Sequence, residues 1–325
     1  MFNAIRMKCG LRFKLLAGFT VLLAISILAL VLADKWDTYN PLAYILASIS
    51  WLHRDNIGQP KAIGSLVGDK IVVIPALVTD DMSWVATELP DWQHALYIVN
   101  PANNTIGITA DLSTSQLTTP MNKGKESMAY LTYIIDNYAS GQIPSIVSFL
   151  HSHRRGFFSA WHVDTPLHDN AMAMKLLRLD TVKERGYVNL RCNWNPGCTK
   201  RGRNNAHVTR ETWMGVMGNT STPLFNSRLG SPGALPAETE ISDEEDHNKI
   251  TVWTACCAQF AVSREAIYAR PLEDFVNMRR WLMETELDDA RSGRVFEYLW
   301  HVIFGMEATF CPDEEMCYCD VYGRC

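Results

Sequence analysis

Residues 123–153, KGKESMAYLTYIIDNYASGQIPSIVSFLHSH, contain the two patterns that decide the fold. The first is helical, because apolar side chains recur at the spacing of one helix face, at Met128, Leu131, Ile134, Ile135 and Tyr138. Pro144 ends this pattern, since proline lacks the amide hydrogen that a helix interior needs. The apolar run at 146–150 then predicts a buried strand, so a helix is followed by a strand.

The same alternation continues upstream. Two further apolar runs, at 71–77 and 95–99, predict buried strands, and a helical stretch near 84–89 separates them. Alternating strands and helices favour a mainly parallel sheet flanked by helices, a Rossmann-like α/β fold. We therefore expect an α/β domain over residues 69–310.

Downstream, a polar stretch at 199–249 changes the character of the chain. It holds several glycines and prolines, which predicts a long functional or disordered loop. A strand-like run at 250–260 and three helices should follow. The sequence predicts starts for these helices at Ser263, Pro271 and Ser292, and an end for the last one at Gly305.

The N-terminus predicts a membrane anchor. Residues 15–33 are almost all apolar, and at roughly 1.5 Å per residue they approach the roughly 30 Å hydrocarbon core of a bilayer. Lysine and arginine precede this run, which favours a cytosolic tail at 1–14 and a translocated remainder. We expect a single-pass type II protein of the Golgi or secretory pathway, with a stem at 34–68. A cleaved signal peptide ending near Ala33 is the alternative.

The cysteines fit an oxidising lumen. Eight of the nine follow the apolar run, and an even number in such a compartment predicts disulfides. Four lie in the tail at 311–325, where we expect two disulfides, with a zinc site as the alternative. Cys256 and Cys257 are adjacent, so we expect them to bond to different partners. Sequons at Asn103 and Asn219 fit the same side of the membrane.

Ligands of open α/β sheets bind beyond the carboxyl ends of the strands, and three segments fall there. The first holds Asp80 and Asp81, which would contact a nucleoside or simply cap a helix. The second is a turn before the long helix, where amides and lysines suit a diphosphate, although the same residues are ordinary turn formers. Its predicted donor-binding residues are Asn122, Gly124, Lys125 and Glu126.

The third segment is rich in histidine. His151 and His153 directly follow the strand at 146–150, and His162 and Asp164 come shortly after. Imidazole and carboxylate are ligands of zinc and manganese, so these four residues predict a divalent-metal site. The alternative is a polar loop whose histidines bond to the backbone. The net charge of −5 argues against a nucleic-acid partner.

A further candidate lies on the last expected helix, over 294–304. Glu297 and His301 are four residues apart, so on one helix they would share a face. Such a pair suits a general base and its partner, and an ion pair that fixes the helix is the alternative.

Taken together, these segments resemble a fungal family of domains of unknown function. The resemblance covers about residues 69–306 and rests on five motifs: N-x-G-x-E from Asn122, H-x-H at 151–153, W-H-x-D at 161–164, C-C-A-Q-F at 256–260 and E-Y-L-W-H at 297–301. This likeness implies no settled biochemistry.

The order of elements is also similar to the GT-A fold of nucleotide-sugar glycosyltransferases. In that fold an N-x-G helix precedes a strand that ends in Asp-x-Asp, and here His151-Ser152-His153 stands in that position. The substitution favours a softer metal than usual. The resemblance implies an enzyme that transfers a sugar from a nucleotide-sugar donor to a glycan or small-molecule acceptor, with Glu297 as base. A metal-dependent hydrolase or oxidase and a non-catalytic glycan-binding protein are the alternatives.

Overall fold

The computed structural model describes residues 21–23, 25–26, 69–100, 117–156, 162–198, 207–218, 250 and 252–325. The chain divides into two units, 1–53 and 54–325, and the fold below is that of the second. Within the described residues, no helix has the length and apolar character needed to cross a membrane.

Several predictions fall outside the described part of the chain. They are the cytosolic tail, the stem, both sequons at Asn103 and Asn219, and all of the 15–33 anchor except residues 21–23 and 25–26, which are helical.

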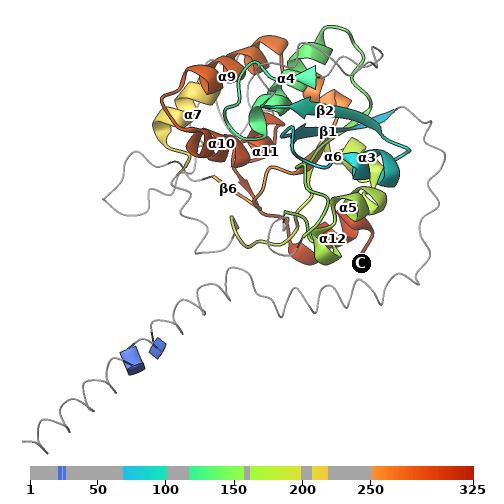
Figure 1. Ribbon diagram of the computed structural model, residues 1–325, viewed down its shortest axis with the longest axis vertical. Coiled ribbons are helices and arrows are strands. Elements are labelled where there is room, and N and C mark those ends of the chain that lie inside the picture. The colour runs from blue at the N-terminus through green and yellow to red at the C-terminus, as the bar shows by residue number, and fades with distance from the viewer. Residues whose placement is uncertain are drawn as a thin grey trace, which may run out of the picture. The chain divides into compact units, whose positions relative to one another are not determined.

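The second unit is built on a six-stranded mixed sheet with the order β3-β2-β1-β4-β7-β5 (Figure 1). The parallel neighbours are β3 with β2, β2 with β1, and β1 with β4, whereas β7 runs antiparallel to β4 and β5. The strands are β1 (Lys70–Ala76), β2 (Gln93–Ile98), β3 (Leu117–Thr118), β4 (Ile146–Phe149), β5 (Tyr187–Asn189) and β7 (Phe260–Ser263). A separate parallel pair joins β6 (Trp253–Thr254) to β8 (Thr309–Phe310). The predicted α/β fold with a mainly parallel sheet is confirmed.

The sheet has a topological switch point between β1 and β4. From β1 the chain goes outward to β2 and β3 on one side, and then returns to form β4 on the other side. Crossovers that leave in opposite directions open a crevice at the carboxyl ends of the two central strands, where open α/β sheets bind ligands.

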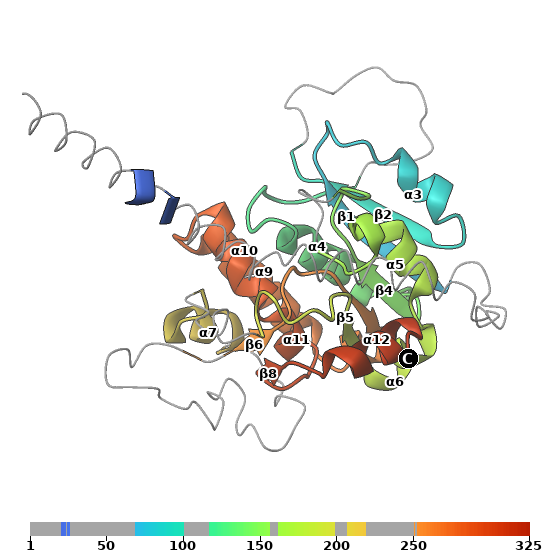
Figure 2. The ribbon, with the colours of Figure 1, turned by 90° about the horizontal axis from the view of Figure 1, so that it is seen from below.

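Helices cover both faces of the sheet. They are α3 (Ser83–Glu88), α4 (Ser127–Tyr138), α5 (Asn170–Leu176), α6 (Leu179–Arg185), α7 (Arg210–Met217), α8 (Arg264–Tyr268), α9 (Leu272–Glu284), α10 (Asp289–Glu297), α11 (Trp300–Ile303) and α12 (Glu314–Tyr322), with a 3₁₀ turn η1 (Pro166–His168). Helix α4 packs on β1 and against α9, whereas α6 contacts β4, β5 and β7. In Figure 1, and from below in Figure 2, α4 and α9 lie on one side of β1, and α5 and α12 lie on the other.

Strand β1 is buried on both faces, as its continuous apolar sequence requires. Val72, Val73 and Ile74 are each 0% exposed. Alternate side chains point to opposite faces, so Ile71 and Val73 join the core beneath α4 and α9 while their neighbours pack on the other side.

An aromatic cluster anchors the carboxyl end of β4. The ring of Phe149, the last residue of β4, lies 4.6 Å from that of Tyr130 and 4.9 Å from that of Phe260. The Phe260 ring is in turn 5.3 Å from Trp300. Large rings packed at these distances bury much apolar area and fix the strand end from which His151 and His153 emerge.

The C-terminal helices differ from the prediction in two places. Ser263 caps α8 as expected, accepting the amide of Ala266. Helix α10, however, begins after Asp288, whose carboxylate accepts the amide of Arg291, while the predicted cap Ser292 lies inside the helix and bonds to the carbonyl of Asp288. The single helix expected over 294–304 is also wrong. It breaks at Tyr298 into α10 and α11.

The disulfides form, but with other pairings than predicted. Cys192 bonds to Cys317 and Cys198 to Cys311, so two bridges fasten the tail to the segment at 192–198. Only Cys319–Cys325 lies within the tail, where two were expected. Cys256 and Cys257 bond to each other and not to separate partners, and the backbone at Cys257 has a positive φ of 103°.

The segment expected to be a loop at 199–249 contains α7 in its described part. Thr209 and Thr212 form a capping box at its start, and Trp213, Val216 and Met217 are buried against the core. Helix α7 contacts α9. The short apolar pattern was hidden by the glycines and prolines around it.

Candidate metal centre

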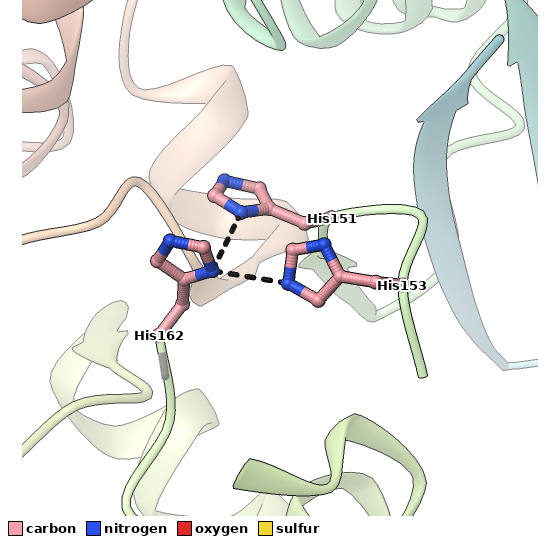
Figure 3. Close-up of side chains that lie close together, drawn as sticks. All are labelled: His151, His153 and His162. Atoms are coloured by element: carbon pink, nitrogen blue, oxygen red, sulfur yellow. Dashed lines mark hydrogen bonds between the residues drawn. The ribbon is translucent and has the colours of Figure 1, made fainter. Parts of the chain in front are cut away.

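Three histidines meet at the switch point of the sheet. His151 and His153 follow directly from β4, and His162 comes from the segment that leads into η1 (Figure 3). Fixing one strand end and the segment before η1 is therefore enough to bring the three rings together.

One nitrogen of each ring points into the same space. His162 Nδ1 lies 3.0 Å from His153 Nε2 and 3.2 Å from His151 Nδ1. All three nitrogens lie within 4.8 Å of one another. Zinc bound to imidazole at about 2.0–2.1 Å in tetrahedral geometry separates its ligand nitrogens by about 3.3 Å. The observed spacings are close to that value, so the three nitrogens can share one divalent cation.

Burial keeps the three rings neutral at physiological pH. It lowers the pKa of His151 well below its usual value, and the neighbouring His162 and His153 lower it further. Burial likewise lowers the pKa of His162, to about 3, and lowers that of His153 against the opposing effect of Asp80. A neutral imidazole keeps one lone pair for a metal, and the tautomer that turns this lone pair toward the shared space is the one that binds.

Two buried amide side chains hold the backbone of the histidine segment. Gln259 Oε1 accepts the amide of His151 at 2.7 Å, and Asn170 donates through Nδ2 to the carbonyl of His153 at 2.9 Å. Gln259 belongs to the C-C-A-Q-F motif, but neither role was predicted. The signal in the sequence was present for Gln259, a polar residue placed beside a buried strand.

Two carboxylates border the histidines. Glu126 Oε2 lies 3.9 Å from His151 Nε2, the ring nitrogen that does not face His162. Burial first, and then the nearby Glu297 carboxylate, raise the pKa of Glu126 to about 8. Burial also raises the pKa of Glu297, although Glu297 pairs with Arg294 at 2.8 Å and accepts the amide of Cys257. The site therefore combines neutral imidazoles with carboxyl groups that retain a proton more readily than usual.

Asp80 and Asp81 lie in the β1–α3 connection beside the centre. Asp80 accepts the amide of Leu77 at 2.9 Å, and its charge acts on His153. Asp81 accepts the amide of Ser83 at 3.0 Å at the start of α3. A polar pocket beside them is lined by Asp81, Ser83, Trp84, Thr87, Glu88, Arg154 and Arg155.

In the turn before α4, the backbone amide of Lys125 is already bonded and is not available to a ligand. Lys125 donates its amide to Asp289 at 2.9 Å, and its ammonium group pairs with the same carboxylate at 2.7 Å. Gly124, at φ +75°, packs so closely that a Cβ there would lie 2.5 Å from Leu282. The carboxylate of Asp289 thus occupies the position where the sequence suggested a diphosphate. Asn122 lies on the exposed side of this turn, and only Glu126 faces the histidines.

Two predicted site residues serve other partners. Asp164 Oδ2 accepts the amides of Cys192 and Asn193 at 2.7 and 2.8 Å, which ties it to the disulfide-bonded segment. His301 is 0% exposed, and its Nε2 bonds to the carbonyl of Ala308 at 3.1 Å. Because the helix breaks at Tyr298, the expected one-helix face shared by Glu297 and His301 does not form.

Each of the five motifs has at least one described residue in or beside this centre, namely Glu126, His151, His162, Gln259 and Glu297. A family described as a protein of unknown function, DUF3431, matches residues 72–320. The chain belongs to the DUF3431 family. The resemblance to a family of unknown function is therefore confirmed, whereas fungal origin and the GT-A likeness remain predictions. The DUF3431 match spans the sheet, apart from the first two residues of β1, and the three histidines. No curated protein and no solved structure matches this chain.

Proposed function

We propose that this chain is a metal-dependent glycosyltransferase, in which His151, His153 and His162 hold a divalent cation. The observation that supports the cation most directly is the convergence of three neutral ring nitrogens at the switch point between β1 and β4. Zinc fits best, because an all-imidazole ligand set suits it better than magnesium or calcium. Manganese is the second choice.

A cation at this position would neutralise the diphosphate of a nucleotide-sugar donor and leave room for further ligands. Three protein ligands around a tetrahedral metal leave one position open, as in catalytic zinc sites. Asp80 and Asp81 border the same edge and suit the hydroxyl groups of a ribose or sugar. The choice of sugar transfer rests on the order of elements, which is an argument from analogy.

The buried carboxyl groups supply the acid–base chemistry of this proposal. Glu126 and Glu297 lie on the α4 and α10 side of the centre, and burial raises the pKa of each. A raised pKa makes a carboxylate a better acceptor of a hydroxyl proton. Glu297 already has Arg294 and the Cys257 amide as partners, so Glu126 is the freer base of the two.

A metal-dependent hydrolase is the second candidate, and the same ligand set favours it. Three histidines with an open fourth position are the arrangement that lowers the pKa of a zinc-bound water toward neutrality. In that reaction Glu126 would accept the proton of the attacking water.

Calorimetric titration of the full chain with uridine and guanosine diphosphate sugars, each with and without added zinc or manganese, tests the proposal. Sugar transfer predicts metal-dependent binding of at least one donor and little release of free sugar without an acceptor. Rapid release of free sugar or phosphate would favour the hydrolase. Absence of nucleotide binding in the metal-loaded protein would reject the transferase.

A further inference from the structure

The Cys256–Cys257 disulfide lies beside Glu297, and the proposed reaction uses neither of its sulfur atoms. The two Sγ atoms and a carboxylate oxygen of Glu297 all lie within 4.8 Å of one another. Cys257 also donates its amide to that carboxylate. The two sulfurs and the carboxylate oxygen thus lie close enough together to surround one metal ion.

The backbone of this segment is held in a rare conformation. Cys257 has φ 103° and Ala258 has φ 49°, and neither residue is glycine. Non-glycine residues in this region persist where the surrounding structure fixes them, and they cluster at functional sites. Here the fixing contacts are the amide of Cys256 on the carbonyl of Pro196 and the side chain of Asn189 on the carbonyl of Ala255.

We propose that Cys256, Cys257 and Glu297 form a second cation site that the disulfide closes and reduction opens. A dithiol reductant transfers two electrons and two protons to the disulfide, gives two cysteine thiols, and is itself oxidised to a disulfide. Binding of a soft divalent cation then displaces the two thiol protons, so two thiolates and the Glu297 carboxylate become its ligands. Thiolate ligands select zinc or cadmium over magnesium or calcium.

The two cysteines differ in their exposure to solvent. Cys257 is partly exposed, whereas Cys256 is buried with 2% of its surface accessible. Thiol–disulfide exchange needs attack on one sulfur only, through a mixed disulfide, so the accessible Cys257 is sufficient. The second site shares no ligand with the histidine centre, so cadmium binding to it can be measured whether or not the proposed function holds.

Reduction of the disulfide would also affect the histidine centre. The amide of Cys257 contacts Glu297, and two residues further on Gln259 holds the amide of His151. A change in the Cys257 backbone would thus act on both. Reduction would couple the redox state of the pair to the geometry of the histidine segment.

Cadmium titration of the full chain tests the proposal, read by the ultraviolet charge-transfer band of cadmium bound to thiolate. After treatment with dithiothreitol, the wild-type protein should bind one cadmium more than the Cys256→Ser/Cys257→Ser variant treated in the same way. The other cysteines are present in both proteins, so they cancel in this comparison. Oxidised wild-type protein should lack the extra band.

Glu297→Gln provides a second test that keeps both cysteines and the disulfide. It should weaken the extra cadmium site about 10-fold or more in the reduced protein, in line with the loss of an interaction near a metal. His162→Asn should leave that site unchanged. Equal cadmium uptake by reduced wild type and the double serine variant would overturn the proposal, as would an extra site that is indifferent to Glu297→Gln.

Discussion

Glu126 Oε2 lies 3.9 Å from Nε2 of His151, whose other ring nitrogen, Nδ1, faces His162. A histidine that ligates a metal through one nitrogen usually presents the proton of the other to a carboxylate or carbonyl. In the described part of the chain this Nε2 is buried without a hydrogen-bond partner, and Glu126 is the carboxylate that lies beside it. The motif that suggested a donor-binding helix start therefore supplies a carboxylate next to a proposed metal ligand.

Replacement of Glu126 should weaken metal binding without removing it. Loss of a carboxylate that orients a ligating histidine typically lowers metal affinity about 10–100-fold. Glu126→Ala should fall in that range, and Glu126→Gln should have a smaller effect because its amide oxygen keeps an acceptor beside Nε2 of His151. Competition with a chromophoric zinc chelator measures both. Glu315→Gln on the exposed side of α12 is the matched control, and an affinity in Glu126→Ala equal to that of this control would argue against the assignment.

Acidification should destabilise the metal-free protein below about pH 6.5. The pKa of His162 falls from 6.5 to about 3 on folding, so between these values the unfolded chain binds a proton that the folded chain does not. The contribution of His162 to stability is therefore complete above pH 6.5 and is lost as the pH falls toward 3.

Urea unfolding in the presence of a chelator, at several pH values, measures this effect. The difference in unfolding free energy between wild type and His162→Asn should change as the pH is lowered through this window, with the wild type losing more stability. A difference that does not vary with pH would show that His162 titrates normally in the folded state.

Asp164 should matter for folding more than for metal binding. Its carboxylate accepts two backbone amides and lies 3.6 Å from Arg191 Nη1. The side chain of Asp164 is 8% exposed and that of Arg191 is 3% exposed. Removing one partner of a buried ion pair costs about 3–5 kcal/mol. Asp164→Ala should lower the free energy of unfolding by about that amount, while the folded fraction keeps its metal stoichiometry. Loss of metal at unchanged stability would restore Asp164 as a ligand.

Gly124 and Gly141 form a matched pair that tests the packing of the turn before α4. Both have positive φ, +75° and +67°, but a Cβ at Gly124 would lie 2.5 Å from Leu282, whereas nothing lies within 4 Å of one at Gly141. Gly124→Ala should cost about 1–3 kcal/mol more than Gly141→Ala, the usual effect of overpacking. Chemical denaturation of both variants gives the comparison, and equal losses would mean that Leu282 moves aside freely.

The sequence was sufficient for the parts of the fold that depend on local patterns. The apolar runs at 71–77 and 146–150 are near-continuous because both faces of their strands are buried, and they were found within one residue of their observed ends. The last helix was mistaken because Val295, Leu299, Val302 and Ile303 form a continuous apolar stripe at helical spacing. The helix breaks at Tyr298 because α11 packs in the core, and a local sequence pattern contains no information about that packing.

The candidate site was likewise predictable from the sequence only in part. His151 and His153 could be placed from the strand before them, and His162 followed because it is close in the sequence. The contacts of Asp289 with Lys125 and of Gln259 with His151 join residues more than one hundred positions apart. Such pairings depend on the tertiary arrangement, so nothing local in the sequence assigns the Asp289 carboxylate or the Gln259 amide to its partner.

The metal content of the full chain tests the central claim most directly. Protein stripped with a chelator, reloaded with zinc without any reductant and passed through a desalting column should carry one zinc per chain in the wild type. His94→Asn should carry the same amount, because His94 lies at the amino end of β2, where its ring bonds to the carbonyl of Leu89. His162→Asn should carry almost none. Equal zinc in wild type and His162→Asn, or none in the wild type, would contradict a metal centre built from His151, His153 and His162.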